Sequence, residues 1–401
     1  MEPTHPAPSG TGLPAGKPSR TLLPVFLYFL AAGIATVMLG PILPALIQRW
    51  HIQDAQAGTL FTASFAGQFL GAWFATRNLR GSVLYGSAIT AAGCAAMAWV
   101  GFVPAHLALF CIGLGLGAGL TAGNVIAGTT VAAARARLIA MLNVAWGIGA
   151  ITCPVLLRLS SPGGLERFFF LTAALLAVAS LVAIAIPSTR AAQLGEPPLQ
   201  SSPQAKSITS RLPLSPALLF VFGCASFIYV GVENSLGGWL PSYAIRTNPS
   251  LHASTISLYF WIAELTGRAL VTLLMTRLGE ARLFRLCLAL LIFTQILLCA
   301  TASISAAGVI ALTVLAALSL APLYPLLLSF LLARTGNHPR LGELFATASF
   351  GGASLPWLTG LISTQFHGLR AGLIVPAAGA TLILFLSATL TERAATPLTS
   401  S

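Results

Sequence analysis

The chain has 401 residues, of which 56% are hydrophobic and only 7% are charged. So few charged side chains cannot cover the surface of a soluble protein of this size, so the composition predicts a multi-pass membrane protein. Lys and Arg outnumber Asp and Glu by 21 to 9, but the basic residues form no continuous stripe, which argues against a nucleic-acid-binding protein.

Apolar segments recur along the whole chain at lengths that suit a bilayer, which needs about 20 such residues per crossing. The residues before the first segment are rich in Pro, Gly and Ser, and they predict a disordered tail. We expect an all-α membrane protein with twelve transmembrane helices at residues 22–47, 59–76, 82–103, 107–132, 138–159, 168–186, 216–240, 254–276, 283–304, 307–332, 342–362 and 371–390.

One sizeable polar interruption, at residues 188–213, is rich in Pro, Ser and Gln and predicts a cytoplasmic linker. Six predicted spans lie on each side of it. We therefore expect two pseudo-symmetric six-helix bundles at residues 21–187 and 214–391, with cytoplasmic tails at 1–20 and 392–401.

Sequence echoes about 200 residues apart support a duplicated six-helix unit, a common way of building secondary transporters. The clearest are Gly67, Leu70, Thr76 and Arg77 against Gly267, Leu270, Thr276 and Arg277, and Gly40, Leu43 and Pro44 against Gly237, Leu240 and Pro241. In this alignment Thr36 corresponds to Glu233 and Gln68 to Arg268. Coupling chemistry, if present, is therefore expected to be asymmetric between the two halves.

Basic residues are divided unequally between the two sides of the predicted bundles. If the N-terminus is cytoplasmic, fifteen Lys and Arg residues lie inside and only five lie outside: Arg49, Arg158, Arg167, Arg246 and Arg370. The positive-inside rule then places both termini in the cytoplasm. We expect a monomer in the lipid bilayer of a bacterial-type inner membrane.

Residues that would indicate an enzyme or a bound metal follow no recognisable pattern. All six cysteines lie inside predicted spans and are expected to pack as small apolar residues. The six histidines lie in loops or tails without metal-binding spacing, and GxxxxGK[ST] is absent. We expect no catalytic residue, no metal and no cofactor.

The seventh predicted span carries an acid, Glu233, close to Gly231, Gly237, Gly238 and Pro241. A carboxylate near the centre of a bilayer costs about 2.5–3.5 kcal/mol, so it normally faces a wet cavity or a partner. Glycine and proline weaken the helix around it, and broken spans often bind a transported solute. We expect Glu233 to carry a proton; the alternative is a packed, hydrogen-bonded glutamic acid without a role in transport.

The eighth predicted span carries Glu264 and Arg268, four residues apart and therefore on one helix face. One interpretation is a structural salt bridge. The other is that Arg268 alternates between Glu264 and a second acid as a cavity opens and closes. Together with Glu233, these residues are the candidates for coupling.

Uncharged polar and aromatic residues near the middle of spans are the candidates for substrate binding. Amides bind hydroxyl groups, and aromatic rings stack on the apolar face of a sugar; the alternative role is bonding between neighbouring helices. Their number favours a neutral hydroxylated solute over an ion: Gln68, Asn124, Asn143, Trp146, Tyr229, Asn234, Tyr259, Trp261, Gln295, Tyr324 and Trp357.

Small residues, prolines and loop arginines in the repeated motifs are the candidates for conformational change: Arg77, Gly267, Arg277, Pro241, Gly352 and Pro356. The segments YVGVE from Tyr229, LNVAWGIGA from Leu142 and GGASLPWLTG from Gly351 resemble the major facilitator superfamily, and within it fucose permease-like sugar:proton symporters. The resemblance implies two six-helix bundles around a central cavity and alternating access. Where such permeases carry acids in the first and fourth spans, this chain has Pro41 and Leu120.

We therefore expect a secondary active transporter of a small neutral hydrophilic solute, most simply a monosaccharide, coupled to protons through Glu233. Sodium is the alternative coupling ion. Alternative functions are a proton-driven exporter of amphipathic compounds, an uncoupled facilitator and, from a different class, a non-transporting membrane sensor.

Overall fold

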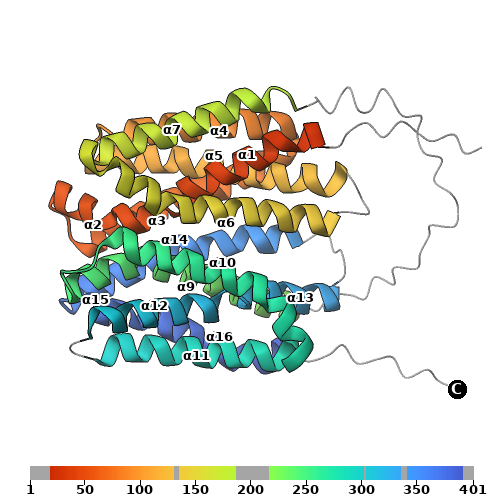
Figure 1. The fold of residues 1–401 in the computed structure, drawn as a ribbon. Helices are drawn as coiled ribbons and strands as arrows, with labels where there is room; N and C mark the ends of the chain where they lie inside the picture. Colours follow the sequence, from red (N-terminus) through yellow and green to blue (C-terminus); the bar gives the residue numbers. More distant parts are fainter. Residues whose placement is uncertain (1–18, 131–134, 187–215, 302–303, 336–340, 392–401) are drawn as a thin grey trace, which may run out of the picture.

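The computed structural model describes residues 19–130, 135–186, 216–301, 304–335 and 341–391. All regular secondary structure in these ranges is helical. The helices form two bundles that lie side by side, the first above the second in Figure 1. The predicted tails and linker lie outside the described residues, apart from Ser19 and Arg20 at the start of the first helix.

Each bundle contains six membrane crossings within the described ranges. One crossing of the first bundle and two of the second are made of two consecutive helices. The first bundle comprises α1 (Ser19–Val37) with α2 (Leu39–Trp50), α3 (Asp54–Phe74), α4 (Leu79–Met97), α5 (Phe102–Thr130), α6 (Arg135–Ser160) and α7 (Gly164–Ala183). The second comprises α9 (Pro216–Thr247), α10 (Ala253–Leu278), α11 (Glu280–Ala300), α12 (Ala306–Leu320) with α13 (Leu323–Thr335), α14 (Leu341–Gln365), and α15 (Leu369–Gly372) with α16 (Ile374–Thr391). The predicted twelve spans in two bundles are confirmed.

The less apolar crossings are mostly those that line the space between the two bundles. Among the described residues, seven crossings are long and apolar enough to span a membrane alone, and α1 with α2, bent by 41°, makes an eighth. Three of the remaining four, α3, α10 and α14, line the space between the bundles. Their lower hydropathy is therefore explained by polar residues that do not face lipid.

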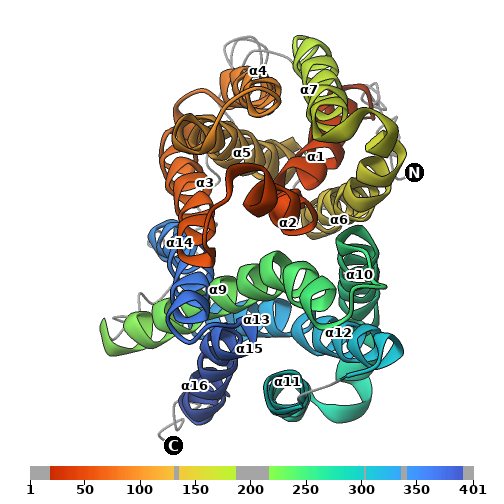
Figure 2. The ribbon, with the colours of Figure 1, turned by 90° about the vertical axis from the view of Figure 1, so that its left-hand side faces the viewer.

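The two ends of the molecule differ. Helices α1 and α9 begin, and α7 and α16 end, at one end, which we call the terminal end and which lies on the right in Figure 1. At the opposite end, shown facing the viewer in Figure 2, α2 packs against α9 and α3 packs against α14. Helices α6 and α10 form a further contact between the bundles.

The contact between α2 and α9 depends on glycine. A Cβ atom added to Gly40 on α2 would lie 2.3 Å from the carbonyl oxygen of Gly237 on α9. Only glycine allows two helix backbones to approach this closely. The two glycines occupy matching positions in the repeat, so the duplicated units meet here through equivalent residues.

Candidate functional site

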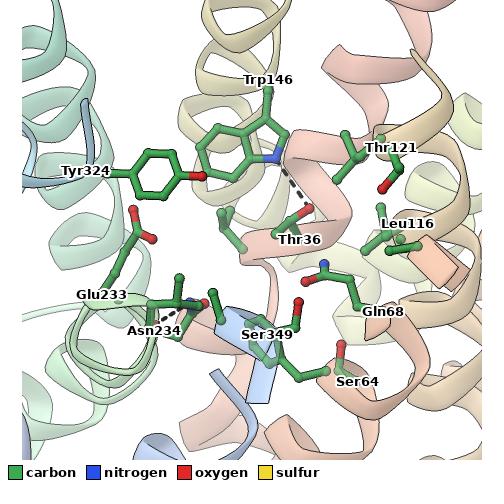
Figure 3. A pocket seen from close by; sticks show the side chains of 18 of the residues that line it. Thr36, Ser64, Gln68, Leu116, Thr121, Trp146, Glu233, Asn234, Tyr324 and Ser349 are labelled. Atoms are coloured by element: carbon green, nitrogen blue, oxygen red, sulfur yellow. Dashed lines mark hydrogen bonds between the residues drawn. The ribbon is translucent and has the colours of Figure 1, made fainter. Parts of the chain in front are cut away.

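A cavity of about 730 Å³ lies between the bundles and is lined by residues of both. Helices α1, α3, α5 and α6 contribute one wall, and α9, α10, α13 and α14 contribute the other. In Figure 3, Glu233 and Tyr324 lie on one side and Gln68 and Ser64 on the other. This size lies within the range of about 300–1,000 Å³ that is usual for small-molecule sites.

The cavity extends toward the terminal end. Its wall includes Trp73 and Thr76, which lie in the last residues of the second crossing and are exposed. At the opposite end the two bundles contact each other, for example at Phe61 and Trp239, whose ring centroids are 6.2 Å apart. The conformation is therefore open at the terminal end and closed at the opposite end.

Three charged residues meet at the wall formed by the second bundle. Arg268 donates from Nη2 to Oε1 of Glu233 at 2.7 Å, and the same nitrogen donates to Oε1 of Glu264. The side chain of Glu264 is 2% exposed, whereas those of Glu233 and Arg268 are 14% and 25% exposed and line the cavity. Glu264 is therefore a counter-ion buried behind Arg268, and Glu233 is the acid that cavity water or a solute can reach.

Tyr229 and Tyr324 surround the exposed acid. The hydroxyl of Tyr229 donates to Oε1 of Glu233 at 3.1 Å, and the two tyrosine rings stack with centroids 5.4 Å apart. Tyr229 lies one helical turn before Glu233 on α9, so regular helix geometry brings the two side chains together.

Trp146 links the charged cluster to the first bundle. The guanidinium carbon of Arg268 lies 5.6 Å from the centre of the Trp146 ring, within the distance of a cation–π interaction. The indole Nε1 of Trp146 donates to Oγ1 of Thr36 at 3.4 Å (Figure 3). The paired repeat positions Thr36 and Glu233, and Gln68 and Arg268, all line this cavity.

Most of the predicted substrate-binding residues line the cavity: Gln68, Asn124, Asn143, Trp146, Tyr229, Asn234, Trp261 and Tyr324. Three lie elsewhere. Gln295 is fully buried on α11 inside the second bundle. Tyr259 is exposed, two residues and hence about 200° around α10 from cavity-lining Trp261. Trp357 lies against Gly58 of α3.

The predicted gating residues have different surroundings. Gly352 lies where the bundles touch, because an added Cβ would be 2.4 Å from the Phe65 ring. Gly267 lies within the second bundle, where an added Cβ would be 2.6 Å from Ala321. Pro356 accepts a hydrogen bond from the Trp239 indole at 2.8 Å.

The other three predicted gating residues make no contact between the bundles that the structure records. Pro241 lies inside α9. Arg77 and Arg277 are exposed at the terminal ends of the second crossing and of α10.

Sequence reasoning missed several small polar residues that line the cavity, including Ser64, Thr121 and Ser349. Helical spacing from predicted residues could have found two of them. Ser64 is four residues before Gln68, and Thr121 is three residues before Asn124, so each pair shares a helix face. It also missed Asp54, whose contacts cross between the bundles.

Comparisons with known proteins agree with this architecture. A family model described as Major Facilitator Superfamily matches residues 25–341. The chain is 22% identical over 376 residues to "Bypass of stop codon protein 6" of Saccharomyces cerevisiae (strain ATCC 204508 / S288c), covering 84% of this chain and 75% of that protein.

Solved transporter structures have the same fold. One is a bacterial homologue of the human lysosomal transporter Spinster in an inward-facing and unoccupied conformation, with a TM-score of 0.71, 17% identity, and coverage of 96% of this chain and 99% of the other. Another is a D-xylose-proton symporter, with a TM-score of 0.72, 14% identity, and coverage of 94% and 98%. At these identities the likeness shows the fold alone.

Proposed function

The chain belongs to the major facilitator superfamily, and from that membership we propose that it moves a small neutral hydroxylated solute, most simply a monosaccharide, together with a proton. The resemblance to fucose permease-like symporters is part of this proposal. The observation that carries it is the cluster of Glu233, Arg268 and Glu264 at the cavity wall.

Charge balance in this cluster supports proton coupling. Two carboxylates share one guanidinium, so the cluster carries one excess negative charge when both acids are ionised. An uncompensated buried charge is unfavourable, and one bound proton makes the cluster neutral. Glu233 is the entry point for that proton, because it lines the cavity and Glu264 does not.

Polar groups around the cavity support a hydroxylated solute. Asn124 Oδ1 and Trp261 Nε1 are a buried acceptor and a buried donor with no hydrogen-bond partner among the described residues. Leaving such an atom unpaired costs about 1–3 kcal/mol, and a hydroxyl group can both donate and accept. Gln68, Asn143 and Asn234 add further amide groups to the cavity wall.

Orientation follows from the basic residues. Among the described residues, nine arginines lie at the terminal end (Arg20, Arg77, Arg80, Arg135, Arg137, Arg277, Arg282, Arg285 and Arg334) and five lie at the opposite end (Arg49, Arg158, Arg167, Arg246 and Arg370). The positive-inside rule assigns the end with more arginines to the cytoplasm. The cavity then faces the cytoplasm.

A second candidate function is proton-driven export of amphipathic compounds. Phe29, Phe61, Phe65 and Trp73 line the same cavity, and its volume of about 730 Å³ leaves room for a solute larger than one sugar. Large aromatic side chains bind apolar groups with little geometric restriction.

Uptake into proteoliposomes tests the proposal. A panel of labelled hexoses and deoxyhexoses is offered with and without an inward proton gradient, and again with sodium. With one proton per solute, each pH unit supports about tenfold accumulation, because a tenfold ratio corresponds to about 1.4 kcal/mol. We expect Glu233→Gln to retain exchange of labelled for unlabelled solute and to lose this accumulation.

Glu166→Gln is the matched control, because Glu166 pairs with Arg49 at 2.9 Å and does not line the cavity. Accumulation by Glu233→Gln equal to that of the control would refute coupling through Glu233. Stimulation of uptake by sodium alone would identify sodium as the coupling ion. Uptake that is independent of either gradient would indicate a facilitator. Binding without flux would indicate a sensor, and flux of hydrophobic cations without sugar flux would favour the exporter.

A further inference from the structure

An ion pair joins the two bundles at the closed end. Both Arg246 nitrogens, Nη1 and Nη2, donate to the Asp54 carboxylate, each at 2.7 Å. Asp54 is the first residue of α3, and Arg246 lies in the last turn of α9. The guanidinium and carboxylate therefore meet in the bidentate geometry that gives strong, direction-dependent pairs.

The second bundle also holds Asp54 from a third helix. Ser363 on α14 donates from Oγ to Asp54 Oδ2 at 2.6 Å. The backbone N–H of the next residue, Ala55, donates to Oγ1 of Thr364 at 2.8 Å. The Asp54 side chain is only 9% exposed, so its partners replace most of the water that an aspartate normally binds.

We propose that Asp54, Arg246 and Ser363 form an interbundle lock that keeps the cavity shut at this end and must separate before a solute can enter or leave there. The lock depends on alternating access, which the proposed function assumes, but on no particular solute or coupling ion. When the lock opens, the Asp54 carboxylate loses these partners. The dipole of α3 still stabilises its negative charge, because Asp54 lies in the first turn of that helix.

Comparison of the two repeats supports a specific role for this pair. Arg49 and Arg246 each lie nine residues after the matching glycines Gly40 and Gly237. Arg49 pairs with Glu166 on α7 in its own bundle, whereas Arg246 crosses to the other bundle. The equivalent arginine therefore provides an internal control, since its ion pair does not have to break when the bundles separate.

The rate at which a reagent reaches the cavity from the closed end shows how often the lock opens. Ser64 lines the cavity and lies ten residues, about 15 Å, along α3 from Asp54. A Ser64→Cys reporter is labelled with a membrane-impermeant maleimide in right-side-out and in inverted vesicles, which separates access from the two ends. The parent chain, which has six free cysteines of its own, measures the background.

We call the end of the molecule that carries the lock the lock side. We expect Asp54→Asn and Arg246→Gln each to speed labelling from the lock side about tenfold, the ratio equivalent to about 1.4 kcal/mol. The double variant should label no faster than either single variant, because both remove the same interaction. Arg49→Gln and Glu166→Gln should label at the parental rate. Labelling from the terminal end should stay high in every variant, which also reports correct folding.

The proposal would be overturned if the Ser64→Cys reporter were labelled from the lock side at the same rate in the Asp54 and Arg49 variants. Additive effects in the double variant would also overturn it, since they would show two independent contacts. If Asp54→Asn fails to fold, Arg246→Gln still carries the test, because the Arg246 side chain is 41% exposed. The labelling needs neither sugar nor gradient, so failure of the proposed transport function leaves this result interpretable.

Discussion

Substitution of Gly40 by alanine tests how the closed end is held together. The added Cβ would lie 2.3 Å from the Gly237 carbonyl oxygen and 3.3 Å from its carbonyl carbon. Close carbon–oxygen contacts between helices are normally about 3.3–3.6 Å, so α2 and α9 would have to separate by about 1 Å. Overpacking of this kind costs about 1–3 kcal/mol.

That cost falls only on conformations in which this end is closed. The ratio of open to closed molecules should therefore rise about 5- to 150-fold. Lock-side labelling of the Ser64→Cys reporter measures the ratio, because a maleimide reaches the cavity from that side only in the open molecules.

Two other glycines are graded controls for this experiment. An alanine Cβ at Gly237 would come no closer than 3.2 Å to its nearest neighbour, the Trp261 ring, so a smaller effect is expected. Gly223 on the same helix has no atom within 4 Å of an added Cβ, so Gly223→Ala should label at the parental rate. Labelling of Gly40→Ala that matches Gly223→Ala would refute the close backbone contact as the determinant of closure.

Three further substitutions test the assignment of residues to the cavity. Gln295→Leu should leave uptake unchanged and keep or raise the thermal midpoint, because the buried Oε1 has no partner among the described residues; impaired uptake would contradict its position outside the cavity. Asn124→Leu should raise the KM for uptake about tenfold, as expected for one lost hydrogen bond to a solute, and an unchanged KM would remove Asn124 from the binding site. Arg268→Lys should lower gradient-driven accumulation at least about tenfold, since lysine lacks the planar group that faces Trp146; accumulation at the parental level would show that a point charge suffices.

The number and position of the spans were predictable, because each crossing requires a long apolar run whatever its neighbours are. The charged cluster at the wall of the second bundle was predictable for a different reason. Glu233, Glu264 and Arg268 interrupt apolar helices, and such interruptions are rare outside functional sites.

Other parts of the site depend on information that the sequence does not display locally. Ser64 and Ser349 face the cavity, yet small polar residues also occur throughout spans as helix–helix contacts. Tyr259 and Trp261 are only two positions apart, but helix rotation sends one out of the bundle and the other to the cavity. The Asp54–Arg246 pair joins residues 192 positions apart, and the sequence indicates a role for Arg246 only in the distribution of basic residues between the two sides.

The contact between Gly40 and Gly237 has a consequence for symmetry. In a two-fold dimer of identical chains, only residues on the rotation axis meet their own copies. Matching glycines that touch therefore mark where the pseudo-two-fold axis passes between the halves. In such a dimer, every ion pair between the two chains that lies away from the axis would have to occur twice.

Joining both halves in one chain removes that restriction. Asp54 is the first residue of α3, whereas α10 begins with Ala253, which has no carboxylate. The chain can therefore have a single bridge on one side of the axis, leaving Arg49 to its own bundle. Two six-helix units joined in one chain can therefore have an odd number of ion pairs between them away from the axis. Two identical units related by a two-fold axis cannot.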